Sequence, residues 1–156
     1  MPDKTHDASV AQDSFPQEVD GLPDAVTTPV VRLSDGDVLP LRIGPVRKRI
    51  SGGLVRMLAY NGSIPGPLLR VGQGTSLTVE VVNDADLEQT VHWHGLRLDN
   101  RFDGVPYETQ DPIPVGGHYR CHLRFPDPGL YWYHPHIRED YGQEMGLYGQ
   151  LIVEPT

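Results

Sequence analysis

The sequence contains a single cysteine, Cys121, so no disulfide bond can form within the chain. The fold must therefore be held by a hydrophobic core, by metal or by a partner, and the redox compartment stays open. No apolar run approaches the length of a membrane span. The first thirty residues also lack the basic start and apolar stretch of a signal peptide, which predicts either a removed export signal or a cytosolic protein.

Basic residues are also few. The chain has 13 Lys and Arg against 21 Asp and Glu, and its formal net charge is -8. This balance argues against a nucleic-acid-binding protein, because phosphate binding needs clustered positive charge. Much of the acid lies in residues 1–22, which are polar and without periodicity. We predict that residues 1–22 form a disordered or loosely docked acidic arm, and that residues 23–156 form a single domain.

Chain breakers, in contrast, are abundant: 17 Gly and 15 Pro separate short β-prone segments. The clearest strand is residues 76–82, where Leu77, Val79 and Val81 alternate with polar residues. No segment is long enough for a crossover helix, so we predict an all-β sandwich or small barrel. The other predicted strands span residues 26–33, 38–43, 54–60, 89–98, 118–125, 130–134 and 150–154.

The connections between these segments also carry predictions. The first three predicted strands are interpreted as successive antiparallel strands, with turns at residues 34–37 and 44–45. Residues 61–67 are too rich in breakers for regular structure and are predicted to form a loop. One helical turn or an irregular loop is predicted within residues 137–149.

Two pairs of histidines share one spacing: His92 with His94, and His134 with His136. Residues two apart on an extended strand point to the same face, so each pair can direct two imidazoles into one small volume. One such pair could arise by chance, but two pairs flanked by aromatic residues favour a metal site at which all four imidazoles converge. Imidazoles without a nearby thiolate or carboxylate cage indicate copper or zinc, and spacing alone does not choose between them.

Longer motifs surround both pairs. Residues 92–95 read His-Trp-His-Gly, residues 126–136 read Pro-Asp-Pro-Gly-Leu-Tyr-Trp-Tyr-His-Pro-His, and an Asp-Gly begins at Asp103 between them. These motifs closely resemble the first two copper motifs of laccase-like multicopper oxidases, and the likeness runs from about residue 60 to residue 155. The resemblance implies a cupredoxin-like Greek-key β-sandwich. It also implies a share in a trinuclear copper cluster, which in this family reduces dioxygen to water.

The resemblance gives each imidazole a role. His92 resembles the ligand of the type 2 copper, His94 and His134 resemble ligands of one type 3 copper, and His136 resembles a ligand of the other. Asp103 resembles the acid that orders water near the type 2 copper and passes protons to reduced oxygen. An Asp before Gly is equally typical of a turn, so a structural role for Asp103 competes with the catalytic one.

The chain lacks the type 1 copper site through which this family takes electrons from its substrate. No His-Cys-His triplet occurs, and we interpret Cys121 as a small buried hydrophobic residue, so no type 1 copper is expected. The family's cluster uses eight histidines, and the two pairs supply four. The others must come from a complementary cupredoxin domain or chain, or from a second copy of this chain.

Other residues receive structural interpretations. His118 and His122 do not have the paired spacing and are expected to be solvated or hydrogen-bonded. The aromatic residues beside the ligands are expected to pack the core and exclude water, namely Trp93, Trp132, Tyr131 and Tyr133. Residues 138–141, directly after the second pair, are interpreted as a solvated loop that could line an interface.

Three functional hypotheses follow. The first is an oxidoreductase component that, with a complementary domain, couples substrate oxidation at an external type 1 copper to the reduction of dioxygen. The second is a non-catalytic copper-binding or storage module, which could be a homodimer, with zinc binding as a weaker variant. The third is a regulatory or assembly subunit of a larger oxidase. Because proteins of this family are usually exported, the resemblance implies a periplasmic or secreted location.

Overall fold

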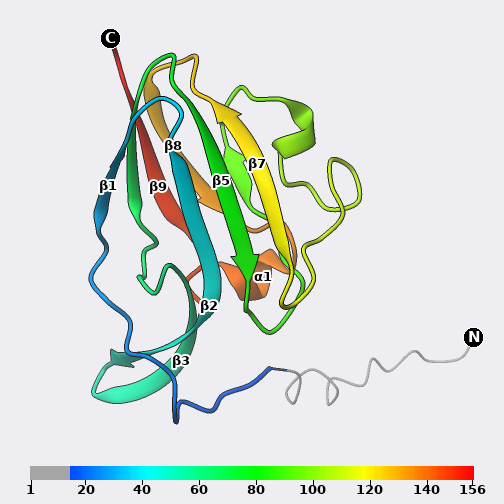
Figure 1. The fold of residues 1–156 in the computed structure, drawn as a ribbon. Coiled ribbons are helices and arrows are strands. Elements are labelled where there is room, and N and C mark those ends of the chain that lie inside the picture. The colour runs from blue at the N-terminus through cyan, green and yellow to red at the C-terminus, as the bar shows by residue number, and fades with distance from the viewer. Residues whose placement is uncertain (1–14) are drawn as a thin grey trace, which may run out of the picture.

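Two β-sheets pack face to face and form a sandwich (Figure 1). The structure, a computed structural model, describes residues 15–156, so residues 1–14 of the predicted arm lie outside the described residues. Within the described range the strands are short and are separated by turns, as the breakers predict. The elements are β1 (Val30–Leu33), β2 (Val38–Ile50), β3 (Gly53–Tyr60), β4 (Leu68–Gly72), β5 (Ser76–Asn83), β6 (His92–His94), the 3-10 turn η2 (Asn100–Phe102), β7 (His118–Arg124), β8 (Gly129–His134), α1 (Glu139–Gly142) and β9 (Gly149–Glu154).

The two sheets differ in size. One has five strands in the order β1-β4-β9-β8-β6, and the other has four in the order β3-β2-β5-β7. In Figure 1, β2, β5 and β7 lie in the foreground, and β8 and β9 lie behind them. The predicted all-β sandwich is therefore confirmed, and the predicted helical turn is present as α1.

The pairing of the first strands differs from the prediction. β1 and β2 are not antiparallel neighbours: β1 pairs in parallel with β4, and β2 pairs in parallel with β5. The reason is the turn between them, where Gly36 has φ +83° and donates its N–H to the carbonyl of Ser76. This turn carries the chain from one sheet to the other, so both strands pair with later segments. Only β2 and β3 form the predicted antiparallel pair.

β2 is longer than predicted, because it continues through Gly44 and Pro45. Its first half, up to Ile43, pairs with β5, and its second half, from Ile43 onwards, pairs with β3. Beyond Ile43 no second strand within residues 15–156 pairs with the other edge of β2, which is bridged at Arg47 by backbone hydrogen bonds with Pro23 and Ala25. A proline, which has no N–H to donate, is tolerated at such an edge.

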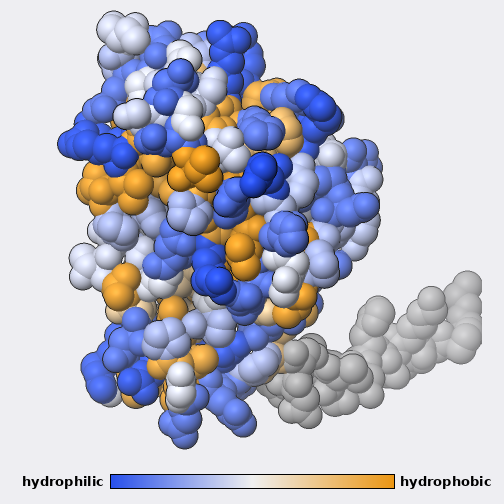
Figure 2. All heavy atoms as spheres, in the orientation of Figure 1, coloured by the Kyte–Doolittle hydropathy of each residue, from blue (hydrophilic) through white to orange (hydrophobic). Residues whose placement is uncertain are grey.

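The core fills the space between the sheets. Leu77, Val79 and Val81 on β5 are at most 3% exposed, which confirms the alternation predicted for this strand. The outer face of the four-stranded sheet, seen in Figure 2, carries hydrophilic side chains with hydrophobic ones between them. Burying a large apolar side chain stabilises the fold by about 1.5–3 kcal/mol, so this core can hold the sandwich without a disulfide. The largest fully buried side chains are Trp93, Tyr60, Tyr133, Phe125, Leu41, Ile43, Leu58, Leu69, Leu123, Leu147, Leu151 and Gln89.

The segment before β1 packs against the sandwich through Phe15. The ring of Phe15 stacks on that of Tyr141 in α1, with ring centroids 3.8 Å apart. Among the described residues, no helix is both long and apolar enough to cross a membrane.

Candidate metal centre

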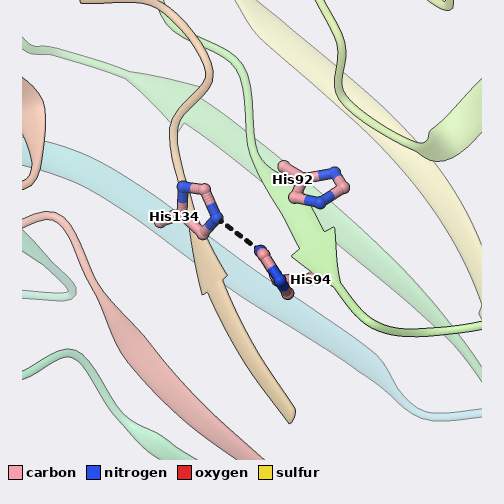
Figure 3. Close-up of side chains that lie close together, drawn as sticks. All are labelled: His92, His94 and His134. Carbon is pink, nitrogen blue, oxygen red and sulfur yellow. Dashed lines mark hydrogen bonds between the residues drawn. The ribbon is translucent and has the colours of Figure 1, made fainter. Parts of the chain in front are cut away.

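The ladder between β6 and β8 positions three of the predicted ligands. His92 lies opposite His134, and Trp93 lies opposite Tyr133. Because side chains alternate along a strand, the aromatic rings of Trp93 and Tyr133 enter the core, where they are 1% and 0% exposed. His92, His94 and His134 therefore point away from the core, on the outer face of the sheet near the end of β8 (Figure 3).

The three imidazoles are close enough to bind one ion. Their ligand atoms all lie within 4.8 Å of one another. His94 Nδ1 and His134 Nε2 are 3.2 Å apart, as the dashed line in Figure 3 marks. Two nitrogens bound at about 2.0–2.1 Å to one tetrahedral ion would be about 3.3 Å apart. The spacing of this pair therefore fits a shared metal.

His136 joins the cluster although it lies beyond the last residue of β8. Its ring centroid is 4.5 Å from that of His92 and 5.3 Å from that of His134. Its backbone N–H donates to the Thr90 hydroxyl at 3.2 Å, which ties residues of the second pair to the segment before β6. The structure thus brings all four predicted imidazoles together.

Hydrogen bonds determine which ring nitrogens are free. His92 Nδ1 lies 2.6 Å from the Asp103 carbonyl oxygen, and His134 Nδ1 lies 2.9 Å from the Pro135 carbonyl oxygen. A carbonyl oxygen can only accept, so both Nδ1 atoms carry the proton and both Nε2 atoms keep a lone pair. Metal-binding histidines are commonly oriented in this way by a partner of the second nitrogen.

Burial and exposure divide the cluster into an inner and an outer part. His134 is only 3% exposed, and this burial lowers the pKa of its imidazole, with the neighbouring His92 and His136 acting in the same direction. His134 therefore stays neutral, which is the form that binds metal, to a lower pH than a free histidine. His94 is exposed, so the cluster opens to the surface on that side.

Comparison with known proteins identifies the family to which a chain with these two histidine pairs belongs. A family model described as a multicopper oxidase matches residues 42–156. The chain belongs to the multicopper oxidase family. The match covers every strand from β3 to β9 and includes both histidine pairs. Because the solved structures similar to this chain are themselves multicopper oxidases, the cupredoxin-like Greek-key fold expected from the resemblance is confirmed.

Individual multicopper oxidases show how much of the family this chain spans. Copper resistance protein A of Pseudomonas syringae pv. tomato is 35% identical over 127 residues, which cover 81% of this chain and 20% of that protein. A multicopper oxidase of Mycobacterium tuberculosis is 39% identical over 113 residues, or 72% of this chain and 22% of the relative. The crystal structure of a multi-copper oxidase from Pseudomonas thermotolerans has a TM-score of 0.74 and 35% identity, covering 81% of this chain and 30% of that one. The chain spans about a fifth of the length of the curated relatives it matches.

Asp103, the predicted acid of the multicopper oxidase motif, contacts His92 in two ways. Its backbone carbonyl accepts from Nδ1, and its carboxylate Oδ1 lies 3.4 Å from the same nitrogen. The side chain is 29% exposed, so water can reach it. Asp103 also ends η2, which agrees with the turn interpretation, and its role in proton transfer stays a prediction.

Gly104 follows Asp103 and allows the Asp103 carbonyl to reach His92 Nδ1. Replacing Gly104 tests the importance of this contact. Gly104 has φ +76°, and a Cβ atom at this position would lie 2.1 Å from the Val91 carbonyl oxygen. We expect Gly104→Ala to lower the free energy of unfolding by about 2–5 kcal/mol, through overpacking and the left-handed backbone together. It should also weaken copper binding, because the Asp103 carbonyl moves away from His92. Urea unfolding and copper titration measure the two effects.

Gly116 is the matched control for that substitution. It also has φ +76°, but nothing lies within 4 Å of the position of its Cβ. Gly116→Ala should therefore cost only the backbone strain, about 1–2 kcal/mol, and leave copper binding unchanged. If Gly104→Ala and Gly116→Ala lost equal stability, the clash between the new Cβ at position 104 and the Val91 carbonyl would be unimportant.

Three side chains near the imidazoles were not predicted as parts of the site. Glu139 Oε1 lies 2.7 Å from His136 Nδ1, Gln143 Nε2 lies 3.2 Å from His134 Nδ1, and the Thr90 hydroxyl accepts from the backbone of His136. The sequence holds one signal for them, because Glu139 follows His136 by three residues. Trp132, predicted to pack the core, is not among the core residues and instead stacks on His134, with ring centroids 3.9 Å apart.

The remaining histidines of the described region lie elsewhere. His118 and His122 are exposed on β7 in the opposite sheet, and His122 Nδ1 lies 3.1 Å from the Thr78 hydroxyl. The prediction that they are solvated or hydrogen-bonded is confirmed.

Cys121 is buried between the sheets, as predicted, with 2% of its surface exposed. This burial raises the pKa of its thiol to about 12. At pH 8 only about one molecule in ten thousand then carries the reactive thiolate. We expect no reaction with Ellman's reagent in the folded protein over an hour, and full reaction in denaturant. Rapid labelling of the folded chain would contradict the buried position.

Proposed function

We propose that this chain supplies four of the histidine ligands of a trinuclear copper cluster in a laccase-like multicopper oxidase. The pair His94 Nδ1 and His134 Nε2, 3.2 Å apart, carries the proposal, because two imidazole nitrogens at this distance can bind one ion when the proton they share is released. We assign these two residues to one type 3 copper. We assign His92 to the type 2 copper and His136 to the other type 3 copper.

The donor set fits copper. The nitrogens that converge are imidazoles; the Nδ1 atoms of His92 and His134 are hydrogen-bonded, which leaves Nε2 for the metal, and His136 Nδ1 lies 2.7 Å from the Glu139 carboxylate. Neutral imidazoles of this kind suit copper and zinc, and membership of the multicopper oxidase family favours copper. His94 is the exception, because its Nδ1, and not its Nε2, faces His134 and is the nitrogen proposed to bind the metal.

The four paired histidines of this chain are half of the ligands that the cluster needs, so the other ligands must come from elsewhere. The family's cluster needs eight histidines, and His94 lies on the exposed side where further ligands could approach. We propose that a complementary cupredoxin domain or chain supplies them. A second copy of this chain is the alternative source, because identical subunits most often pair about a two-fold axis.

Within the cluster each described residue has a task. Copper, when bound, supplies the redox chemistry that reduces dioxygen to water, with substrate electrons arriving from a type 1 copper outside this chain. The Nδ1 hydrogen bonds of His92 and His134 hold their rings in place. The ring of Trp132 excludes water from one face of His134. The Asp103 carboxylate, close to His92 and partly exposed, holds a proton and passes it towards reduced oxygen.

A second candidate function is a copper-binding or storage module without catalysis. The exposure of His94 favours it, because two copies of an open cluster could face each other and share copper. The oxidase component reduces dioxygen and needs a complementary domain, whereas the storage module does not react with dioxygen and needs only a second copy of itself.

One experiment separates them. The purified chain is loaded with copper, its copper content and oligomeric state are measured, and oxygen uptake with a phenolic dye is followed with and without the remaining domains of a related oxidase. The oxidase proposal predicts copper binding without turnover for the chain alone, and turnover when the complementary domains are added. A copper-loaded homodimer that stays inactive in both cases favours storage. Turnover by the isolated monomer would contradict a shared cluster.

A further inference from the structure

The segment after the second histidine pair folds back onto the cluster. Arg138 has φ 41°, a left-handed conformation that turns the chain before α1 begins. As a result Glu139, the first residue of α1, directs its carboxylate towards the cluster. Glu139 Oε1 lies 2.7 Å from His136 Nδ1, and the second oxygen, Oε2, accepts from Gln143 Nε2 at 3.4 Å.

The other side of α1 is anchored to the body of the domain. The Tyr141 hydroxyl donates to Asp86 Oδ2 at 3.0 Å. Asp86 in turn forms an ion pair with Arg56 of β3, and the two side chains are only 12% and 8% exposed. The ring of Phe15 covers Tyr141 from outside. This anchor fixes the position of a helix that would be too short to be stable alone.

We propose that Glu139 is a positioning residue for His136. Its carboxylate accepts the Nδ1 proton, which sets the ring tautomer and leaves Nε2 free for a metal. The two other oriented rings use backbone carbonyls for this purpose, whereas His136 uses a side chain, so this contact can be removed by substitution. The part of the proposal that concerns copper rests on the proposed function, and the part that concerns the tautomer does not.

Glu139 is more than a solvated loop residue, because one of its carboxylate oxygens contacts His136 and the other accepts a hydrogen bond from Gln143. The Gln143 amide nitrogen also lies 3.2 Å from His134 Nδ1, but both atoms carry protons, so the hydrogen bond of Gln143 is the one to Glu139. A charged acceptor forms a stronger hydrogen bond than a neutral one, so Glu139 should orient its ring firmly. Loss of a partner that orients a metal-binding histidine typically weakens metal binding by about 10- to 100-fold.

The first test uses the metal-free protein. Nitrogen-15 NMR of the imidazoles at pH 8, with the His136 signals assigned from a His136→Gln sample, reports which ring nitrogen carries the proton. We expect a single Nδ1–H tautomer for His136 in the wild type and a mixture of tautomers in Glu139→Ala. Glu144→Ala is the matched control, because Glu144 is exposed and lies five residues further along the chain. An unchanged His136 tautomer in Glu139→Ala would overturn the proposal whether or not the chain binds copper.

The second test measures copper affinity by competition with a chelator. We expect Glu139→Ala to lose about 10- to 100-fold, Glu139→Gln to lose less because its amide oxygen still accepts, and Glu144→Ala to match the wild type. Thermal unfolding of the metal-free variants should be unchanged, which separates positioning from folding. Wild-type affinity in Glu139→Ala would overturn the copper part of the proposal. Failure of the wild type to bind copper would instead contradict the proposed function and leave the NMR test decisive for Glu139.

Discussion

Replacing His94 with alanine should lower the affinity of the chain for copper by a hundredfold or more. Removal of a partner that merely orients a ligand typically costs about 10- to 100-fold, and loss of a ligand should cost at least as much. His94 Nδ1 lies 3.2 Å from His134 Nε2, so the substitution removes one of the two nitrogens proposed to share an ion. Copper bound after dialysis, measured by mass spectrometry, and chelator competition together give the affinity.

The fold should survive this substitution. His94 is exposed on the outer face of the sheet, whereas the core lies on the other face, so the metal-free variant should unfold at the wild-type temperature. His122→Ala is the matched control, because His122 is an exposed strand histidine of the opposite sheet, and it should bind copper normally. Unfolding of His94→Ala would show that the ligands have a structural role, and full copper binding by this variant would remove His94 from the site.

Replacing Trp93 with alanine should have the largest effect on stability. The indole is 1% exposed and packs against Tyr133, with ring centroids 5.5 Å apart. Truncation of a buried tryptophan typically lowers the free energy of unfolding by about 3–5 kcal/mol, and a domain of this size is stable by about 5–15 kcal/mol. Because His92 and His94 flank Trp93 on β6, loosening of this strand should also weaken copper binding. Urea unfolding followed by circular dichroism measures the loss.

Two further variants make this result specific. Leu130→Ala removes a hydrophobic side chain that is 81% exposed on the neighbouring β8, and it should change stability by less than about 0.5 kcal/mol. Trp93→Phe keeps an aromatic ring in the core and should retain more stability than Trp93→Ala. If Trp93→Ala were as stable as the wild type, the indole would have no part in holding β6 to the core.

The parts of the molecule that follow from local pattern could be predicted from the sequence. The alternation of Leu77, Val79 and Val81 identified a half-buried strand, because a strand exposes alternate side chains to the core. The same rule placed His92 and His94 on one face. The resemblance to multicopper oxidases then joined the two histidine pairs, which no local pattern connects. It is the β6–β8 ladder that brings His92 and His134 opposite each other.

Other features depend on contacts between distant segments. Whether β2 continues through Pro45 is decided by the absence of a strand partner along that edge, which the sequence of β2 does not record. The parallel pairing of β1 with β4 likewise depends on which sheet each strand joins. Glu139 reaches His136 only because Arg138 adopts a left-handed conformation, which is unusual for a residue with a long side chain.

The arrangement of β6 and β8 has a consequence for how such domains can change over time. Adjacent positions on these strands face opposite sides of the sheet: Trp93 and Tyr133 lie in the core, and the proposed ligands His92, His94 and His134 point away from it. We therefore expect that an exposed imidazole such as that of His94 can be lost or regained by mutation while the domain stays folded. A lineage that lost its metal would still inherit a sound scaffold, on which a different binding surface could evolve.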